Sequence, residues 1–190
     1  LPEPYFPLKV MVCDRCFLVQ LQESLSVEQI FNQDYVYFSS VNEGFVRHAE
    51  RYVANLVEDF GLDRSSFVVE AASNDGYLLQ FVRDRGIRCL GVEPSGSTAK
   101  AAQERGIDTA IEFFTEEFAR RIVEGSGKAD ILIGNNVLAH VPDINDFISG
   151  IATILADEGV AVIEFPHLLN LVRERQFDTV YHEHFSYLSL

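Results

Sequence analysis

The chain has 190 residues, 47% of them apolar, and its 15 Lys and Arg against 29 Asp and Glu give a formal net charge of −14. This size suits one sizeable core with a small appendage, and the excess of acid excludes a long track of phosphate contacts, so no nucleic acid partner is expected. No apolar run approaches the roughly 20 residues that cross a bilayer, and the start does not resemble a signal peptide, so no membrane partner is expected. Three cysteines do not suit a secreted disulfide framework, which predicts a reducing, cytoplasmic location.

Residues 1–41 form the first of two expected regions, a partial zinc-binding and substrate lobe. Cys13 and Cys16 precede a strand-like stretch at 17–21, which has the shape of one half of a zinc ribbon. A tetrahedral site needs four ligands, and Cys89, in a predicted core strand, is more typical of a small buried residue. A redox Cys-x-x-Cys is the alternative, although the strand-turn-helix setting of thioredoxins is absent. Cys13 and Cys16 are therefore predicted zinc ligands whose partner pair would precede the chain.

The second region, residues 42–190, is predicted to be the cofactor-binding core. It opens with a helix over residues 42–60, where apolar side chains recur at spacings of three and four, and Gly61 provides a stop. Short apolar strands then alternate with amphipathic helices. Strands this apolar are buried on both faces by crossover helices, which predicts an α/β fold, a doubly wound, Rossmann-like parallel sheet with one ligand crevice at its carboxyl edge. The expected strands cover residues 67–72, 88–93, 109–111, 129–134 and 159–165.

The loop after the first of these strands is expected to hold the cofactor, because helix N-terminal amides and close backbone approach are available there. Glu70 lies at the strand end, Ser73 and Asn74 lie in the turn, and Gly76 allows close approach. The loop lacks the G-x-G-x-x-G spacing of a dinucleotide site. A carboxylate beside small and amide side chains suits a cationic, zwitterionic ligand instead. S-adenosylmethionine (SAM), with its ammonium, carboxylate and sulfonium, is the predicted cofactor.

Three further strand ends complete the predicted cofactor site with a ribose acceptor, an aromatic wall for adenine and a loop for the methionine part. Glu93 is the ribose acceptor, about twenty residues after the loop. Solvated acids at strand ends and aromatic residues in the core are ordinary alternatives, but the order of these pieces along successive strand ends favours SAM. In chain order they are Glu93, Pro94, Ser95, Phe113, Phe114, Asn135, Asn136, Val137 and His140.

The densest cluster of ionisable side chains lies at residues 178–187. Imidazoles with a near-neutral pKa beside a carboxylate supply a general base and an orienting group, so His182 or His184 is predicted to remove a proton from a carbon next to a ketone. In an extended segment the two histidines would share one face, and only a local bend would bring Glu183 and His184 into one pocket. A metal site on the His-x-His spacing, or histidines that hydrogen-bond at a sheet edge, are the alternatives.

With these residues in view, the chain resembles the sugar-nucleotide C-methyltransferases of deoxysugar and antibiotic-sugar pathways over nearly all of its length. Several of the matching strings are unusual, including Tyr-His-Glu-His at 181–184, so the resemblance is specific. The matching stretches are residues 13–21, 35–40, 70–76, 91–95, 135–143, 164–166 and 177–187.

The resemblance implies a zinc-binding lobe with two Cys-x-x-Cys pairs, a SAM-binding core, and a C-terminal lobe that helps hold a TDP-sugar, which is methylated at a carbon beside its 4-keto group. It implies that His184 is the base, that Tyr181 and Glu183 lie close by, and that Tyr35 or Tyr37 lies over the active site.

The chain departs from this pattern because it lacks the first Cys pair and stops before the C-terminal lobe. We therefore expect it to be cut from a longer protein, and to bind SAM while being inactive by itself. An O- or N-methyltransferase of the same fold, a non-catalytic SAM-binding module and a metal hydrolase are the rival functions. The sequence leaves the oligomeric state open.

Overall fold

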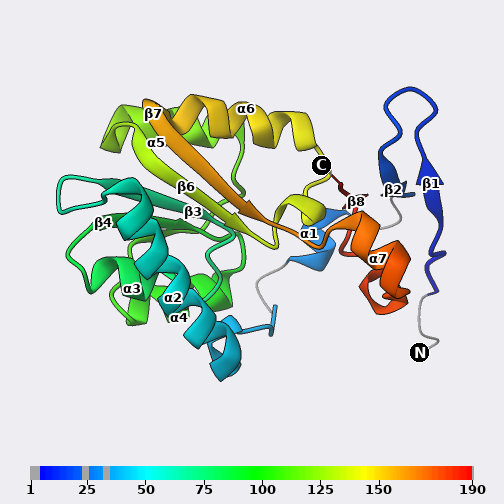
Figure 1. Cartoon of the computed structure of the whole chain (residues 1–190), viewed down its shortest axis with the longest axis horizontal. Coiled ribbons are helices and arrows are strands. Elements are labelled where there is room, and N and C mark those ends of the chain that lie inside the picture. The colour runs from blue at the N-terminus through cyan, green and yellow to red at the C-terminus, as the bar shows by residue number, and fades with distance from the viewer. Residues whose placement is uncertain (1–4, 23–25, 32–34, 190) are drawn as a thin grey trace.

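A five-stranded parallel sheet lies at the centre of the computed structural model, which describes residues 5–22, 26–31 and 35–189 (Figure 1). Its strands are β3 (Phe67–Ala71), β4 (Arg88–Val92), β5 (Thr109–Ala110), β6 (Ala129–Asn135) and β7 (Leu155–Glu164). They lie in the order β5-β4-β3-β6-β7, and every neighbouring pair is parallel. The predicted doubly wound α/β class is confirmed.

Strand β7 begins earlier than the predicted start at residue 159. Asp157 and Glu158 precede Gly159, a run that resembles a turn in the sequence, but the chain stays paired with β6 through a register shift. A Cβ atom at Gly159 would lie 2.8 Å from the carbonyl oxygen of Ala129, so the glycine permits the close approach of the two strands. The irregular pairing explains why the sequence hides this part of the strand.

Helices cover both faces of the sheet. The helix predicted at 42–60 corresponds to α2 (Glu43–Phe60). Asn42 caps its N-terminus, where the side chain accepts hydrogen bonds from the amides of Gly44 and Phe45. Gly61, in a left-handed conformation, caps its C-terminus. Alternate residues of β3 point into two separate cores, one on each side. One core lies under α2, α3 (Leu79–Arg83) and α4 (Gly96–Glu104), and the other under α5 (Glu116–Ser126) and α6 (Ile144–Ile154).

A second, antiparallel sheet joins the two ends of the chain beside the main sheet (Figure 1). Its strands are β1 (Val10–Val12), β2 (Val19–Leu21) and β8 (Ser186–Tyr187), and Val19 pairs with Tyr187. The strand predicted at 17–21 is thus present, while the division at residue 41 stays a prediction. The remaining elements are α1 (Val27–Ile30), η1 (Ser39–Val41), η2 (Leu138–His140), α7 (Leu168–Glu174) and η3 (Phe177–Thr179).

None of the helices within the described ranges has the length and apolar content to span a membrane.

The strand order reverses between β3 and β6. The chain places β4 and β5 on one side of β3 and then returns to place β6 and β7 on the other. The loops that leave β3 and β6 therefore diverge, and a crevice opens between them at the carboxyl edge of the sheet. This edge is where the sequence places its predicted cofactor residues.

Gly91 sets how closely the loop after β3 approaches β4. A Cβ atom at this position would lie 2.4 Å from Oγ of Ser73 and 3.2 Å from Oγ1 of Thr109. Ser73 is fully buried in the loop, so its side chain has little room to withdraw. The absence of a side chain at Gly91 thus lets the loop fold back over the neighbouring strand.

We expect Gly91→Ala to lower the thermal midpoint, at a cost of about 1–3 kcal/mol, because the added methyl group overlaps Ser73. Ser73→Gly in the same protein should restore part of the loss. Gly125→Ala is the matched control, since nothing lies within 4 Å of a Cβ placed there in α5. An unchanged melting temperature for Gly91→Ala would contradict the packing described.

Candidate active site

A cavity of about 1080 Å³ opens at the carboxyl edge of the sheet. It exceeds the roughly 300–1,000 Å³ of typical small-ligand pockets, so it has room for more than one ligand group. Residues from both predicted sites line it together, which brings the cofactor and catalytic predictions into one space. The predicted residues that line it are Tyr35, Tyr37, Asn74, Glu93, Pro94, Phe113, Phe114, Asn135, Asn136, Val137, His140, Tyr181, Glu183 and His184.

Five of the predicted cofactor and catalytic residues lie outside the lining. Glu70, Ser73 and Ser95 are buried beneath it, and Gly76, with φ of +74°, shapes the turn and packs against α4. His182 faces the other way: its Nε2 lies 3.3 Å from the carbonyl oxygen of Pro7, and its ring meets that of Phe6 edge-on. The structure therefore separates His182 from the catalytic prediction and keeps His184 in it.

Glu93 is held at the cavity wall by backbone amides. The amide of Asn74 donates to Oε2 and the amide of Ser95 donates to Oε1, both at 2.9 Å, and the residue is only 5% exposed. Burial raises the pKa of Glu93, while the amides of Ser95 and Asn74 and the hydroxyl of Thr98 oppose the rise. These three donors leave part of the roughly four acceptor positions of a carboxylate open to a ligand hydroxyl. The predicted role as a ribose acceptor requires such an open position.

Glu70 lies fully buried below the same loop, and its Oε2 has no hydrogen-bond partner among the described residues. Burial raises the pKa of Glu70 well above its ordinary value, and the charges of Glu93 and Asp75 raise it further. Glu93 faces the cavity, and the carboxyl groups of Glu70 and Asp75 lie behind it, outside the lining. Arg105 pairs with Asp75, whereas Glu70 has no such partner within the described ranges, so a cationic ligand at this end would interact favourably with the carboxyl groups. The sulfonium and ammonium of SAM fit this requirement.

The two rings of the predicted adenine wall, Phe113 and Phe114, are only partly exposed to the cavity. Phe114 is 9% exposed and its ring meets that of Phe147 edge-on, with centroids 5.3 Å apart, so it also belongs to the core under α5 and α6. Phe113 is more exposed, and both rings contribute to the cavity lining. The functional and structural interpretations of this pair are therefore compatible.

Sequence reasoning missed the roles of two polar side chains in the cofactor loop. Asn74 uses its side chain to bind residues 37 and 39, and Asp75, absent from the predicted site, is fully buried and binds Ser40 and Arg105. Asn74 has a left-handed backbone conformation, with φ of +51°, which asparagine adopts more readily than most residues. An Asn-Asp-Gly string predicts a turn, but nothing local predicts a partner some 35 residues away.

A turn at residues 181–184 brings together the residues of the predicted catalytic cluster. The amide of His184 donates to the carbonyl of Tyr181 at 3.0 Å, so the segment is bent rather than extended, and Glu183 and His184 both face the cavity. Nδ1 of His184 lies 2.7 Å from the carbonyl oxygen of Thr179, and Nε2 lies 3.0 Å from the hydroxyl of Tyr181. A carbonyl can only accept, so Nδ1 carries the hydrogen, and Nε2 presents its lone pair towards Tyr181.

His184 is poised as a neutral base. It is 6% exposed, and burial lowers its pKa, although the contact with Thr179 opposes the shift. The ring of His140 lies 4.7 Å away, centroid to centroid. Burial and the neighbouring His184 lower the pKa of His140 to about 4, so both imidazoles are neutral near pH 7. Burial also raises the pKa of Glu183 beside them. The cavity therefore holds a neutral imidazole whose tautomer leaves Nε2 as the accepting nitrogen, as the predicted role of His184 as a base requires.

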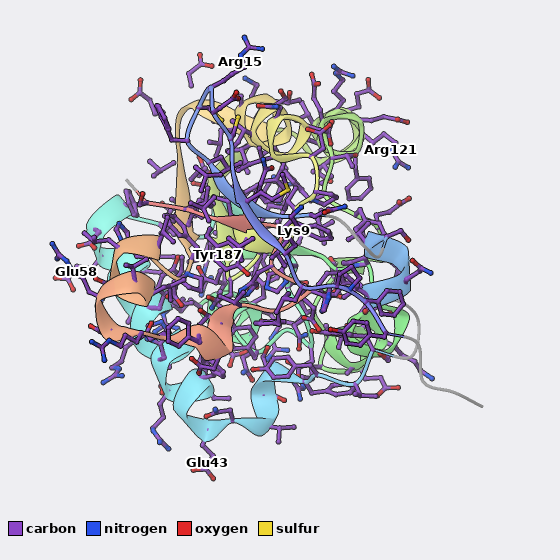
Figure 2. The ribbon with its side chains drawn as sticks, turned by 90° about the vertical axis from the view of Figure 1, so that its right-hand side faces the viewer. Lys9, Arg15, Glu43, Glu58, Arg121 and Tyr187 are labelled. Carbon is purple, nitrogen blue, oxygen red and sulfur yellow. The ribbon has the colours of Figure 1, made fainter. Side chains whose placement is uncertain are left out.

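Cys13 and Cys16 lie in the turn between β1 and β2. The carbonyl of Cys13 accepts the amide of Phe17, and Figure 2 shows Arg15 of the same turn at the tip of the hairpin, far from Tyr187. Hydrogen bonds from the backbone of Cys16 and Arg15 lower the pKa of the Cys13 thiol, which favours the thiolate that zinc binds. The pair can supply two ligands. Within the described ranges, no group of three or more His, Cys, Asp or Glu side chains could hold a metal.

Comparisons with known proteins agree with this architecture. A family described as "Methyltransferase domain" matches residues 45–190, and one described as "Putative zinc binding domain" matches residues 1–31. The chain is 38% identical over 188 residues to a protein from Streptomyces niveus named C-methyltransferase NovU. The match covers 99% of this chain and 44% of that protein, so the chain spans less than half the length of this curated relative.

Solved methyltransferase structures share the fold. A SAM-dependent methyltransferase from Archaeoglobus fulgidus matches with a TM-score of 0.59 at 15% identity, over 74% of this chain and 63% of that one. Magnesium protoporphyrin IX methyltransferase (ChlM) from Synechocystis PCC 6803, solved with bound S-adenosylhomocysteine (SAH), matches with a TM-score of 0.56 at 19% identity, over 85% and 75% of the two chains. At these identities the likeness concerns the fold alone.

The tautomer of His184 has a measurable consequence. The hydroxyl of Tyr181 donates to the lone pair that protonation would use, so we expect Tyr181→Phe to raise the pKa of His184 towards its ordinary value. A titration of the imidazole ¹⁵N shifts by NMR would measure it, and would also show Nδ1 protonated in the neutral form.

Tyr5→Phe is the control, because Tyr5 is 92% exposed. A pKa of His184 that falls or stays unchanged in Tyr181→Phe would contradict the assigned hydrogen bond.

Proposed function

Because the chain belongs to the methyltransferase-domain family, with a zinc-binding-domain match at its N-terminus, we propose that it is the catalytic core of a SAM-dependent enzyme that methylates carbon in a nucleotide-linked keto-deoxysugar. The observation that carries the proposal is the presence of Glu93 and His184 on the walls of one cavity. A carboxylate suited to a ribose diol and a neutral base with a fixed tautomer together serve deprotonation and methylation in one place.

The cofactor half of the proposal rests on three features. Glu93 presents its carboxylate at the wall, Glu70 carries an orphaned oxygen beneath the loop, and the carboxyl groups gathered at this end favour a cation. SAM supplies an electrophilic methyl group when it is bound. The residues at the ends of β3, β4 and β6 hold its nucleoside and amino-acid parts, and the apolar wall at Phe113 and Phe114 excludes water from the adenine side.

The acceptor half rests on the turn at 181–184. Nε2 of His184 takes the proton from the carbon next to the ketone, and the electron pair of that C–H bond remains on the substrate as an enolate. In the free protein the lone pair of Nε2 faces the hydroxyl of Tyr181, so the hydroxyl must first turn from Nε2 to the ketone oxygen, where it then stabilises the enolate. The carbonyl of Thr179 keeps accepting from Nδ1 and stabilises the imidazolium that forms.

The charge of the cavity limits which part of the acceptor it holds. Lys and Arg are absent from its described lining, and the ranges left undescribed contain neither residue. A diphosphate would meet several carboxylates and no cation there. The sugar ring is therefore the part proposed to enter this cavity, with the nucleotide outside it.

Zinc is the second proposed cofactor. Cys13 and Cys16 supply two thiolates on the hairpin, and the remaining ligands would come from outside the described residues. The reducing location, such as the cytoplasm, stays a proposal that rests on the small and odd number of cysteines. The ion would be structural, since this turn lies apart from the cavity lining.

Binding of SAH, measured by calorimetry, tests the cofactor site. We expect the unaltered protein to bind SAH, and Glu93→Ala to weaken binding about 10- to 100-fold, the range expected when a charged hydrogen-bond acceptor is lost. Glu93→Gln, which keeps the shape and one acceptor, should lose less.

Glu124→Ala, an exposed position on α5, is the control and should bind normally. Thermal melts of each variant would separate unfolding from loss of the ribose contact, and absence of SAH binding to the unaltered protein would refute the cofactor assignment.

Exchange of the substrate hydrogen with solvent tests the base. In the longer protein supplied with a TDP-4-keto-deoxysugar, His184→Ala should slow deuterium exchange next to the ketone by 100-fold or more, a magnitude typical of losing a general base. His182→Ala should leave it within a few-fold, because His182 faces Pro7.

Exchange that persists in His184→Ala would move the base elsewhere. NMR of the product would distinguish carbon methylation from the O- and N-methylation of the rival functions, because the shift of the new methyl group depends on the atom that carries it.

A further inference from the structure

Residues 35–40, which we call the strap, cross the cofactor end of the cavity and are bonded to it along their length. Oγ of Ser97, on α4, donates to the carbonyl of Tyr35 at 2.6 Å. The side chain of Asn74 then binds the strap twice: Nδ2 donates to the carbonyl of Tyr37, and Oδ1 accepts the amide of Ser39, both at 2.9 Å. The strap therefore forms part of the cofactor loop in three dimensions.

The end of the strap is fixed by a buried charge. Asp75 is 0% exposed, and its carboxylate accepts from the amide of Ser40 at 3.3 Å and from the hydroxyl of Ser40. Arg105 completes the group, with Nη1 3.1 Å from Oδ2 of Asp75 and 2.7 Å from its carbonyl, and Nη2 donating to Oγ of Ser40 at 2.7 Å. A buried carboxylate is costly without partners, so release of the strap would leave Asp75 short of two hydrogen bonds.

The same loop holds the ribose-binding carboxylate. The backbone amide of Asn74 donates to Glu93 while its side chain holds the strap. Asn74 is buried, so a movement of the strap would leave both Oδ1 and Nδ2 of its side chain without their hydrogen-bond partners. Any ligand that orders Glu93 therefore also favours the bound position of the strap.

The strap carries Tyr35 between the two halves of the cavity. Tyr35 lines the same cavity as Glu183 of the catalytic turn and Glu93 of the cofactor end. Burial raises the pKa of Tyr35, and the acidic groups around it, Glu183 first, raise it further. Phe31 meets the ring of Tyr35 edge-on at 5.3 Å between centroids. The position of Tyr35 is thus tied to the position of the strap.

We propose that Asp75 and Arg105 are positioning residues: with Ser40 they latch the strap over the cofactor and so couple cofactor binding to the placement of Tyr35 beside the catalytic turn. Neither side chain belongs to the cavity lining, so both act through the strap. This inference rests on the proposed function, since it takes SAM as the ligand at Glu93.

The test uses Ser40→Ala and Arg105→Ala, with SAH as the ligand. We expect each to weaken SAH binding about 5- to 20-fold, the effect of losing one hydrogen bond to a charged partner. The double variant should lose less than the product of the two, because both side chains act on one contact. Arg105→Lys should recover part of the loss, since it restores the charge and not the forked geometry. Lys100→Ala, at an exposed position on the same helix, is the control and should bind SAH normally.

Hydrogen exchange measured by mass spectrometry gives the readout that a merely structural role would not move. In the unaltered protein SAH should slow exchange over residues 35–42. In Ser40→Ala and Arg105→Ala this segment should exchange faster without SAH, while β6 exchanges as before. Uniformly faster exchange in β6 as well, or strap exchange and SAH affinity that do not change, would overturn the coupling. Absence of SAH binding to the unaltered protein would overturn the proposed function first, and the coupling with it.

Discussion

The reversal of strand order between β3 and β6 is the constraint on which the site depends. Parallel strands deliver all their carboxyl ends to one edge, and the reversal parts the loops there. Glu93 at the end of β4, Asn135 at the end of β6 and Glu164 at the end of β7 reach one cavity for that reason alone. Gly91 adds the close approach that lets the loop after β3 fold over β4, so the amide of Asn74 can meet the carboxylate of Glu93.

Three buried carboxyl groups at this edge are satisfied in different ways. Glu93 receives two backbone amides, and Asp75 receives Ser40 and Arg105, whereas Glu70 keeps an orphaned oxygen and a pKa raised well above its ordinary value. The hydrogen bonds of Glu93 and Asp75 also stabilise the fold, because each carboxylate joins segments that are distant in sequence. The third is the one that a cationic cofactor would relieve.

Sequence patterns could predict the features that depend on local periodicity or on strand order. The central strands, the long helix from Glu43, and Glu93 as a strand-end acid all follow from short apolar runs and their spacing. The start of β7 is hidden because Asp157 to Gly159 resemble a turn, and the true pairing involves a register shift.

The partners of Asn74 and Asp75 could not be predicted, because the contacts join positions some 35 residues apart and no periodicity in the sequence indicates them. The sequence indicates that Glu183 and His184 can share one pocket only if residues 181–184 bend. Which histidine enters the pocket depends on tertiary contacts, of His182 with Pro7 and of His184 with Thr179.

The small sheet explains why the two ends of the chain belong to one catalytic unit. The amide of Phe185 donates to the carbonyl of Ala139 in η2, and the carbonyl of Phe185 accepts the amide of Leu21 in β2. The residue next to His184 is therefore bonded to the cofactor-binding core on one side and to the N-terminal hairpin on the other. Since the orientation of a base must hold within a fraction of an ångström, the hairpin would support the proposed base by fixing this backbone, even though its cysteine turn lies apart from the cavity. A structural ion that rigidifies the turn between β1 and β2 would act on the base along the same path, through β2 and β8.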